Sequence, residues 1–378
     1  MRKRGGIVIY LDHAATAPVR AEVLECMLPY FSVSFVNPSS GYCAAREARK
    51  AIDAARRQVA ESIGAKREEI YFTSGGSEAD NWALMGCAAA HPEKKHIITT
   101  AIEHHAVLHT CKALERHGYD ITCLDVDSRG RVSVRDFEHA IRPDTLMASV
   151  MLANNEVGTI EPIAELSEAA HAHGVLMHTD AVQAIGHIPV DAARLGIDML
   201  SVSAHKFGGP KGIGALYVRS GTRIENLIYG GAQERSLRAG TENTPAIAGM
   251  GCAIEIAVSQ MEESCAYIAQ LRDDLQRKLE GIPGIRINGD QSNRLPGHLH
   301  ITIERANTQL LLMQLDIAGI AVSAGSACTS GATERSHVIR AMGLAGENQA
   351  DIRFTLGETN TRCEVDQTIG VLRRILKR

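Results

Sequence analysis

Short apolar stretches alternate with helical stretches between Glu69 and Val218, and this alternation restricts the fold more than any other feature of the chain. It is the pattern of a mainly parallel sheet whose faces are covered by helices. The predicted strands are Ile70–Thr73, Ile97–Thr100, Ile121–Val126, Leu146–Leu152, Val175–His178, Met199–Val202 and Ile213–Val218. Helical runs such as Ala79–Ala90, His105–His117 and Ile163–His173 separate them.

A second, smaller α+β unit is expected after this region. One long helical stretch, Pro245–Glu280, leads to a turn at 281–284. The unit that follows has predicted strands at His298–Ile303 and Ile352–Leu356, and helices at Thr308–Ala318 and Cys363–Leu376. With 378 residues, 45% of them hydrophobic, the chain can bury the cores of two domains. We expect residues 1–15 to pack with the small domain, 16–258 to form the large domain and 259–378 the small one.

Lys206 stands in the run SVSAHKFGGPKGIGALYV, where the strand Met199–Val202 enters a glycine-rich turn. A lysine at a strand end, beside the polar side chains of Ser203 and His205, could bind a carbonyl cofactor as a Schiff base. Its amine becomes a nucleophile only if burial or a nearby positive charge lowers its pKa. The alternative is a solvated surface lysine, which is the more common role of a lysine near a glycine turn.

A candidate phosphate site follows the strand-like run EIYFTS. Gly75 and Gly76 lead into a helix, so backbone N–H groups and the positive end of the helix dipole would face an anion, and Ser77 adds a hydroxyl. The spacing is neither a dinucleotide-binding GxGxxG motif nor a P-loop. A glycine pair before a helix is also ordinary turn chemistry.

In GVLMHTDAVQA, a buried strand ends in Asp180, and Gln183 lies one turn later. A carboxylate at a strand's carboxyl end points into the region where open α/β sheets bind ligands, and it can pair with a protonated ring nitrogen. Asp180 could equally be the N-cap of a helix.

The run EHHAVLHT follows another strand and contains Glu103, His104, His105 and His109. His105 and His109 have the i, i+4 spacing of a metal pair on a helix. No third ligand with suitable spacing accompanies them, so no metal is predicted. We expect one histidine to reach the ligand site and the others to lie on a helix surface.

Cys328 lies in IAVSAGSACTSGATERSHVIRAMG, among small and polar residues typical of an exposed loop where a thiol would be reachable. The other cysteines differ in their surroundings. Cys43 is near a turn, while five are in helix-like periodic segments and are expected to act as small hydrophobic residues: Cys26, Cys87, Cys111, Cys252 and Cys265.

In order along the chain, a phosphate loop, a histidine, Asn154-Asn155-Glu156, Asp180 with Gln183, and the Ser203-x-His205-Lys206 motif resemble the fold-type I enzymes that use pyridoxal 5'-phosphate. The Cys328 segment, with LDHAATAPV and NPSS near the start, makes the chain similar to the cysteine desulfurases of the NifS/IscS type. The resemblance extends from Tyr10 to about Leu376. It implies the α/β fold of that superfamily, with a mainly parallel seven-stranded sheet covered by helices and a smaller α+β domain carrying the cysteine loop.

The resemblance also implies a role for each matching residue. Lys206 would hold the cofactor, Cys328 would accept sulfur, and His104 would stack on the ring and move protons. Asp180 would pair with the pyridine nitrogen and Gln183 with the phenolic oxygen, while Asn155 would face cofactor and substrate and Arg353 would bind the substrate carboxylate. The phosphate would be bound by Gly76, Ser77, Ser203, His205 and, from the neighbouring subunit of a homodimer, Thr241.

The implied reaction converts L-cysteine to L-alanine and leaves a persulfide on Cys328, from which sulfur passes to an acceptor protein for iron–sulfur cluster assembly, tRNA thiolation or another thio-product. Two alternatives stay open. A selenocysteine lyase or another pyridoxal-phosphate-dependent β-eliminase would not need Cys328, and a sulfur-relay protein that had lost catalysis would be expected to lack Lys206 or Asp180. The chain departs from the family at Tyr42, where the early loop usually has histidine.

Composition excludes some partners. The net charge is −4, aromatic residues make up 4%, and there is no long basic stretch, so stable nucleic-acid binding is not expected. No apolar segment approaches the roughly 20 residues of a membrane span. The start of the chain lacks a signal peptide's apolar region, and nine cysteines without paired spacings fit a reducing compartment, so we expect a cytoplasmic location.

Overall fold

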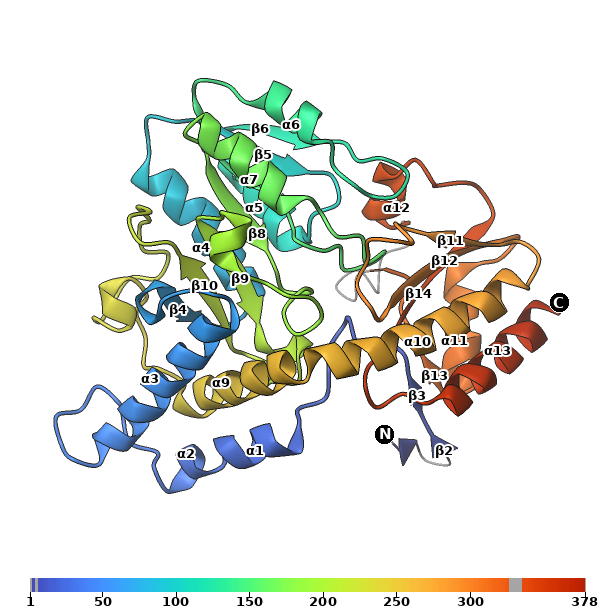
Figure 1. Cartoon of the computed structure of the whole chain (residues 1–378), viewed down its shortest axis with the longest axis horizontal. Helices are drawn as coiled ribbons and strands as arrows, with labels where there is room; N and C mark the ends of the chain where they lie inside the picture. Colours follow the sequence, from blue (N-terminus) through green and yellow to red (C-terminus); the bar gives the residue numbers. More distant parts are fainter. Residues whose placement is uncertain (1, 4–5, 326–334, 378) are drawn as a thin grey trace.

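A computed structural model describes residues 2–3, 6–325 and 335–377, which excludes Cys328 (Figure 1). Its main feature is a seven-stranded sheet with the strand order β4-β10-β9-β8-β7-β5-β6. All neighbouring pairs are parallel except those of β10, which is antiparallel to both β4 and β9. The strands are β4 Ile70–Thr73, β5 His96–Thr100, β6 Asp120–Leu124, β7 Thr145–Ser149, β8 Leu176–Asp180, β9 Met199–Ser203 and β10 Gly214–Val218.

Two hydrophobic cores lie on the two faces of this sheet, because successive side chains of a strand point to opposite sides. In β9, Leu200 and Val202 join one core, whereas Met199 joins the other. The first core is closed by α3 (Ala45–Ser62), α7 (Ile163–Ala172) and α9 (Thr244–Ser259), and the second by α4 (Gly76–Ala90) and α5 (His105–Glu115). The predicted α/β fold with a covered, mainly parallel sheet is confirmed.

A three-stranded antiparallel sheet, β11-β12-β14, forms the centre of the second unit, seen at the right of Figure 1. Its core is separate from the two cores of the large sheet and includes side chains of α10, α11 and α13. The bounds are β11 Ile285–Asn288, β12 His298–Glu304, β14 Gln349–Thr355, α10 Met261–Glu280, α11 Thr308–Ile317 and α13 Arg362–Leu376.

The start of the chain lies against this smaller unit. Strand β3 (Ile9–Tyr10) pairs in parallel with β13 (Ile320–Ala321), and Ile9 and Leu11 belong to the small core. This packing supports the division proposed at residues 15/16 and 258/259, which stays a prediction.

The expectation of one helix over Pro245–Glu280 is wrong. The segment forms two helices, α9 and α10, because Gln260 has ψ near 1° and its backbone N–H bonds to the carbonyl oxygens of Ile256 and Val258, which ends α9. The carbonyl of Gln260 then accepts from Ser264 N, so α10 starts at the next residue. Neither glycine nor proline marks the break, so the sequence gives no warning of it.

The remaining elements are short. They are β1 Arg2–Lys3, β2 Gly6–Ile7, α1 Ala21–Met27, α2 Pro29–Ser32, α6 Val134–Ala140, α8 Ala192–Leu195, α12 His337–Ala341 and three 3₁₀ turns, η1 Arg67–Glu69, η2 Ala204–Lys206 and η3 Glu234–Ser236. In the part of the chain that the structure describes, none of the helices combines the length and the apolar character needed to cross a bilayer.

Candidate active site

Lys206 is the last residue of η2, one turn beyond the carboxyl end of β9. Its Nζ donates hydrogen bonds to the carbonyl oxygens of Ala14 (2.5 Å) and Ala15 (3.1 Å). The side chain is half-buried, and both acceptors belong to the LDHAATAPV run. The amine is therefore held inside the protein by backbone carbonyls and does not have the surroundings of a solvated surface lysine.

Asp180 ends the neighbouring strand, β8, and only 6% of it is exposed. Its Oδ1 accepts from Val182 N at 2.9 Å in a local turn, and no regular helix starts there, so Asp180 is not a helix N-cap. Burial raises the pKa of this carboxyl to about 6, although the Val182 N–H and the Lys206 charge act in the opposite direction. Gln183 Nε2 donates to the Ala14 carbonyl at 3.0 Å, so Gln183 and Lys206 share one acceptor.

His104 is the N-cap of α5, and its Nδ1 accepts from Ala106 N at 3.2 Å. Burial, together with the nearby Lys206 charge, lowers the pKa of His104 to about 4, so the ring is neutral near pH 7. One potential ligand atom from each of His104, Asp180 and Asp80 lies within 4.8 Å of the others. His104 and Asp180 are thus brought together, as the sequence predicts.

The histidine pair considered as a metal site has different neighbours. The rings of His105 and His109 lie 5.1 Å apart, and His105 is 4.7 Å from the ring of His337, all in edge contacts. Among the described residues, these three histidines do not form a group with ligand atoms close enough for one metal ion. His337 Nε2 instead donates to the Glu103 carbonyl at 2.9 Å.

The glycine turn before α4 packs against both the lysine strand and the aspartate turn. A Cβ added to Gly76 would lie 2.7 Å from Val182 Cγ2 and 3.6 Å from Ser203 Cβ, and one added to Gly75 would lie 3.8 Å from Ser203 Oγ. Gly75 has φ +154°, a conformation that glycine adopts easily. The turn therefore needs glycine at position 76 because of the close approach to Val182, and favours it at position 75 because of the positive φ.

The other predicted phosphate ligands surround this turn or extend the lysine motif. Ser77 is exposed in the first turn of α4, and Ser203 is 4% exposed. His205 Nδ1 lies 3.2 Å from Thr16 Oγ1, and burial lowers the pKa of His205 to about 4. A 15-residue helix that begins at a glycine turn beside serine hydroxyls fits a phosphate group, and a buried aspartate next to a lysine fits a pyridine ring. The residues present therefore suit pyridoxal 5'-phosphate.

Arg353 reaches the site from β14 of the smaller sheet and is 1% exposed. Its Nη1 donates to the Asn155 carbonyl and its Nη2 to Asp12 Oδ1, both at 2.8 Å, while the buried Nε has no partner among the described residues. Asn155 is 8% exposed. The sequence analysis did not identify Asp12 as a partner of Arg353. The available signal was a charged residue directly after an apolar stretch, within the LDHAATAPV run.

Two described residues singled out in the sequence, Thr241 and Tyr42, are not part of this group. Thr241 is exposed in the segment before α9, next to Glu242, whose carboxylate pairs with Arg49 at 2.8 Å. Tyr42 is 54% exposed. Cys328 lies outside the described residues.

Two buried carboxyl groups beside the site were also missed. Asp80 is on α4 and Glu103 directly precedes His104, and both side chains are enclosed. Burial raises the pKa of Glu103 to about 8, although Thr100 Oγ1 and Met151 N donate to its Oε1. The available signal for Asp80 was a single charge on the apolar face of a predicted helix.

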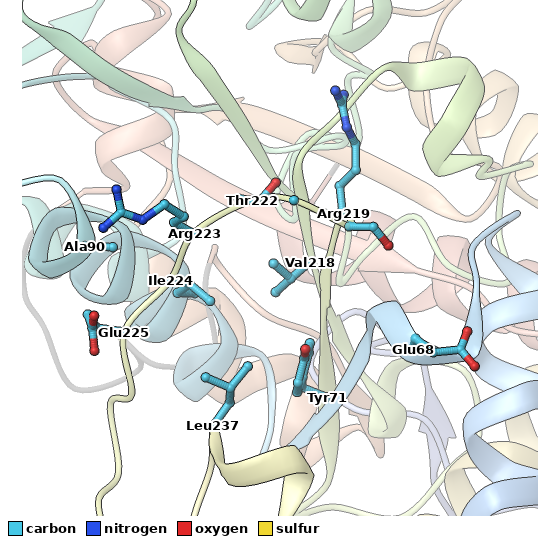
Figure 2. A pocket seen from close by; sticks show the side chains of 12 residues that line it. Glu68, Tyr71, Ala90, Val218, Arg219, Thr222, Arg223, Ile224, Glu225 and Leu237 are labelled. Carbon is cyan, nitrogen blue, oxygen red and sulfur yellow. The ribbon is translucent and has the colours of Figure 1, made fainter.

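A pocket of about 480 Å³ lies around the segment Val218–Glu225 (Figure 2). It is at the amino-terminal end of β9, where Val218 pairs with Met199, whereas Lys206 is beyond the carboxyl end of that strand. The walls are formed mainly by Tyr71, Val218, Arg219, Arg223, Ile224 and Leu237. None of the predicted site residues that the structure describes lines it, so we assign it no part in the chemistry.

The chain matches known proteins over nearly its whole length. The family model for class-V aminotransferases matches residues 9–368. Cysteine desulfurases named IscS from Methanosarcina thermophila and Dictyoglomus turgidum are each 49% identical, with 98% of this chain and 92% and 95% of the relatives covered.

Solved structures give the same result. A NifS-like protein has a TM-score of 0.93 at 38% identity, with 98% of this chain and all of that chain covered. A structure described as SspA in complex with cysteine has a TM-score of 0.83 at 37% identity, covering 93% of this chain and all of the other. The chain therefore belongs to the class-V aminotransferase family and, within it, to the cysteine desulfurases of the NifS/IscS type.

Proposed function

We propose that this chain uses pyridoxal 5'-phosphate to convert L-cysteine to L-alanine and transfers the sulfur, through Cys328, to an acceptor protein. The observation that carries this proposal is the meeting of Lys206, Asp180 and the Gly75-Gly76 turn at the carboxyl ends of β8 and β9. An amine, a carboxylate and an anion site at this edge match the three groups of the cofactor that a protein must hold.

One group of residues would hold the ring of the cofactor and a second group its phosphate. Lys206 would bind it covalently, Asp180 would pair with its ring nitrogen, Gln183 would bond the phenolic oxygen and His104 would stack on the ring. The phosphate would be bound by Gly76, Ser77, Ser203, His205 and, from a second copy of the chain, Thr241. When bound, the cofactor supplies an electron sink for the negative charge that develops at the substrate's Cα.

The protein's own groups would move the protons. Lys206 Nζ would take a proton from the substrate's Cα, and its two hydrogen bonds to backbone carbonyls support this role because they orient the amine. Because Nδ1 of the neutral His104 ring accepts from Ala106 N, the ring's proton is on Nε2, and Nε2 is the nitrogen that would donate. These two groups would share the proton transfers of the reaction.

Arg353 and Asn155 would bind the substrate. A guanidinium suits a carboxylate because it offers two parallel donors. Here Nη1 and Nη2 are engaged with Asn155 and Asp12, and Nε is buried without a partner in the described part of the chain. Binding of an amino-acid carboxylate would therefore give Arg353 a second anionic partner in addition to Asp12 or in its place.

Sulfur transfer would need the Cys328 thiolate to attack the substrate's sulfur, which forms an S–S bond and breaks the C–S bond. The products are a persulfide on Cys328 and, after protonation, alanine. The described residues on both sides of 326–334 lie close to Glu156. A Cβ on Gly325 would lie 3.0 Å from Glu156 Oε2, and Ser336 Oγ donates to the same oxygen at 2.5 Å. Because Glu156 follows Asn155, both flanks of the cysteine segment are near the proposed substrate site.

The test is a comparison of purified wild-type protein with Cys328→Ala and Lys206→Ala. L-cysteine should give alanine and, with a thiol reductant, sulfide in the wild type. Cys328→Ala should retain the visible absorbance of the bound cofactor but lose sulfide release, and Lys206→Ala should lose both products. Normal sulfide production by either variant would contradict the proposal. Turnover of selenocysteine that survives in Cys328→Ala would favour the alternative, a selenocysteine lyase or another β-eliminase.

We also infer a homodimer, in which Thr241 reaches the neighbouring site. Support comes from an exposed apolar patch on α1, α2 and the following loop, formed by Leu24, Leu28, Phe31, Val33 and Phe35. Exposed apolar patches of this kind mark interaction surfaces. The identity of the sulfur acceptor and the cytoplasmic location stay predictions.

A further inference from the structure

Asp80 is a buried acid one turn after the glycine turn, on the face of α4 that covers the large sheet. It is 1% exposed. A carboxylate oxygen of Asp80 lies within 4.8 Å of ligand atoms of both Asp180 and His104. Asp80 is therefore next to the group that would bind the cofactor's ring nitrogen, although no step of the proposed reaction uses it.

Among the described residues, no positive charge neutralises Asp80. His178 Nε2 is 3.7 Å from Asp80 Oδ1, but both ring nitrogens of His178 are within hydrogen-bond distance of serine hydroxyls, Ser149 Oγ at 2.8 Å and Ser201 Oγ at 3.0 Å. Burial lowers the pKa of His178 to about 3, so the ring is uncharged. Asp80 Oδ1 itself has no hydrogen-bond partner within residues 2–3, 6–325 and 335–377. A hydrogen bond with the Ser201 hydroxyl favours the charged form of Asp80, but burial and the Asp180 charge outweigh it, so a carboxylate here would be a poorly compensated buried charge.

Two carboxyl groups this close in a buried space cannot both ionise, so the pair holds one proton near neutral pH. Asp180 is the better anion, because Val182 N donates to its Oδ1 and the Lys206 amine is near it. The other titratable groups that face the pair, His104 and Glu103, are both uncharged near pH 7. Burial and the Asp180 charge raise the pKa of Asp80 well above its usual value.

We propose that Asp80 is a positioning residue that stays a neutral carboxylic acid and thereby keeps the single negative charge of the pair on Asp180, where the ring nitrogen would bind. This inference rests on the proposed function. A second charge at Asp80 would have the Ser201 hydroxyl to offset burial and the repulsion from Asp180, which is too little, whereas a polar but uncharged group stabilises the Asp180 carboxylate by its dipole. Asp80 thus acts on the cofactor only through Asp180.

The first experiment measures cofactor binding, by reconstitution of the cofactor-free protein, in Asp80→Asn, Asp80→Leu and Asp180→Asn. Asparagine reproduces a neutral acid, so Asp80→Asn should bind within about threefold of the wild type. Asp80→Leu should bind about tenfold more weakly, and Asp180→Asn weaker still. Equal losses in Asp80→Asn and Asp180→Asn would show that Asp80 carries the charge, and wild-type binding by Asp80→Leu would show that it has no role. Both outcomes overturn the proposal.

The pH dependence separates positioning from a purely structural role. The anionic form of Asp180 binds the protonated ring, so affinity falls as pH drops through the pKa of Asp180. Without a polar neighbour that pKa rises, so in Asp80→Leu the loss should begin at higher pH than in the wild type and in Asp80→Asn. A damaged fold lowers affinity at every pH and leaves the midpoint unchanged, which would also contradict the proposal.

Infrared spectroscopy of the cofactor-free protein tests the proton directly. At pH 7 the difference between wild type and Asp80→Asn should contain the C=O stretch of a protonated carboxyl group. Glu103→Gln is the matched control, since Glu103 is an equally buried neutral acid and should remove a band of its own. If Asp80→Asn removes only carboxylate bands, the proposal fails. This measurement needs no bound cofactor, so it remains decisive even if the wild type binds none and the proposed function is wrong.

Discussion

Asp180 is a buried carboxylate whose supporting contacts are a backbone N–H and a nearby lysine amine, and burial outweighs both. Its raised pKa means that the folded protein without cofactor binds a proton more tightly than the unfolded chain does. Stability from this group therefore falls as pH rises from about 4, the ordinary range of an aspartate, to about 6. The Asp180 charge thus destabilises the fold without cofactor. A bound, positively charged ring would remove this destabilisation.

Asp180→Asn is accordingly expected to stabilise the cofactor-free protein at pH 7.5 by on the order of 1 kcal/mol, because it removes a poorly compensated buried charge. The same variant should bind the cofactor more weakly. Urea unfolding at pH 7.5 and pH 5 checks the first effect, and the gain should shrink at the lower pH. A loss of stability at pH 7.5 would contradict the argument.

Arg353 gives a second prediction for a single residue. A lysine at this position would keep the charge but lose the fork that binds Asn155 and Asp12. We expect Arg353→Lys to raise the KM for L-cysteine at least tenfold, about 1.4 kcal/mol, with little change in cofactor affinity. Steady-state kinetics test this, with Arg374→Lys on the exposed side of α13 as the control. An unchanged KM would show that Arg353 does not bind the substrate.

Secondary-structure elements were predictable where local pattern decides them. The strands around Ile70–Thr73 and Met199–Val202 match β4 and β9 closely, because near-continuous apolar runs between turns suit a covered sheet. The break at Gln260 was not predictable, since no glycine or proline marks it. Lys206, Asp180 and His104 were found because each follows a strand, whereas the acids Asp80 and Asp12 gain their importance from contacts made only after the sheet is packed.

The start of α4 is the element whose geometry can be tested most sharply. In Gly76→Ala the new methyl group would lie 2.7 Å from Val182 Cγ2, so the turn must shift, at a cost of about 1–3 kcal/mol. Cofactor affinity should fall with it. The matched control is Gly370→Ala in α13, where no atom lies within 4 Å of the added Cβ and the helix should gain about 0.5–1 kcal/mol. Thermal unfolding and reconstitution measure both, and equal effects would refute this reasoning.

At the scale of the whole molecule, the two sheets have separate cores, and the predicted site lies where groups from both approach one another. Lys206 and Asp180 come from the large sheet, whereas Arg353 comes from the small one. This long-range assembly could be inferred only from resemblance, because no local pattern relates residues so far apart in sequence. The apolar patch on α1 and α2 is a further surface of the molecule, and it is exposed in a single chain.

If a second copy covers that patch, Phe31→Asp should produce a monomer, because a charge would be buried in an apolar interface. Light scattering measures the mass. Met313→Asp is the control, since Met313 is comparably exposed, at 54% against 60% for Phe31, but lies on α11 outside the patch. A Phe31→Asp dimer, or a wild-type monomer, would contradict the proposed assembly.

Strand β3 and the residues after it connect the small sheet to Lys206. The strand pairs with β13, continues through Asp12 to the Arg353 guanidinium, and two residues later offers the carbonyl of Ala14 to both Lys206 and Gln183. A tilt of the small sheet would therefore move the carbonyl oxygens of Ala14 and Ala15, which orient the Lys206 amine. Substrate binding at Arg353 and the orientation of Lys206 are therefore coupled through the short segment from Asp12 to Ala14.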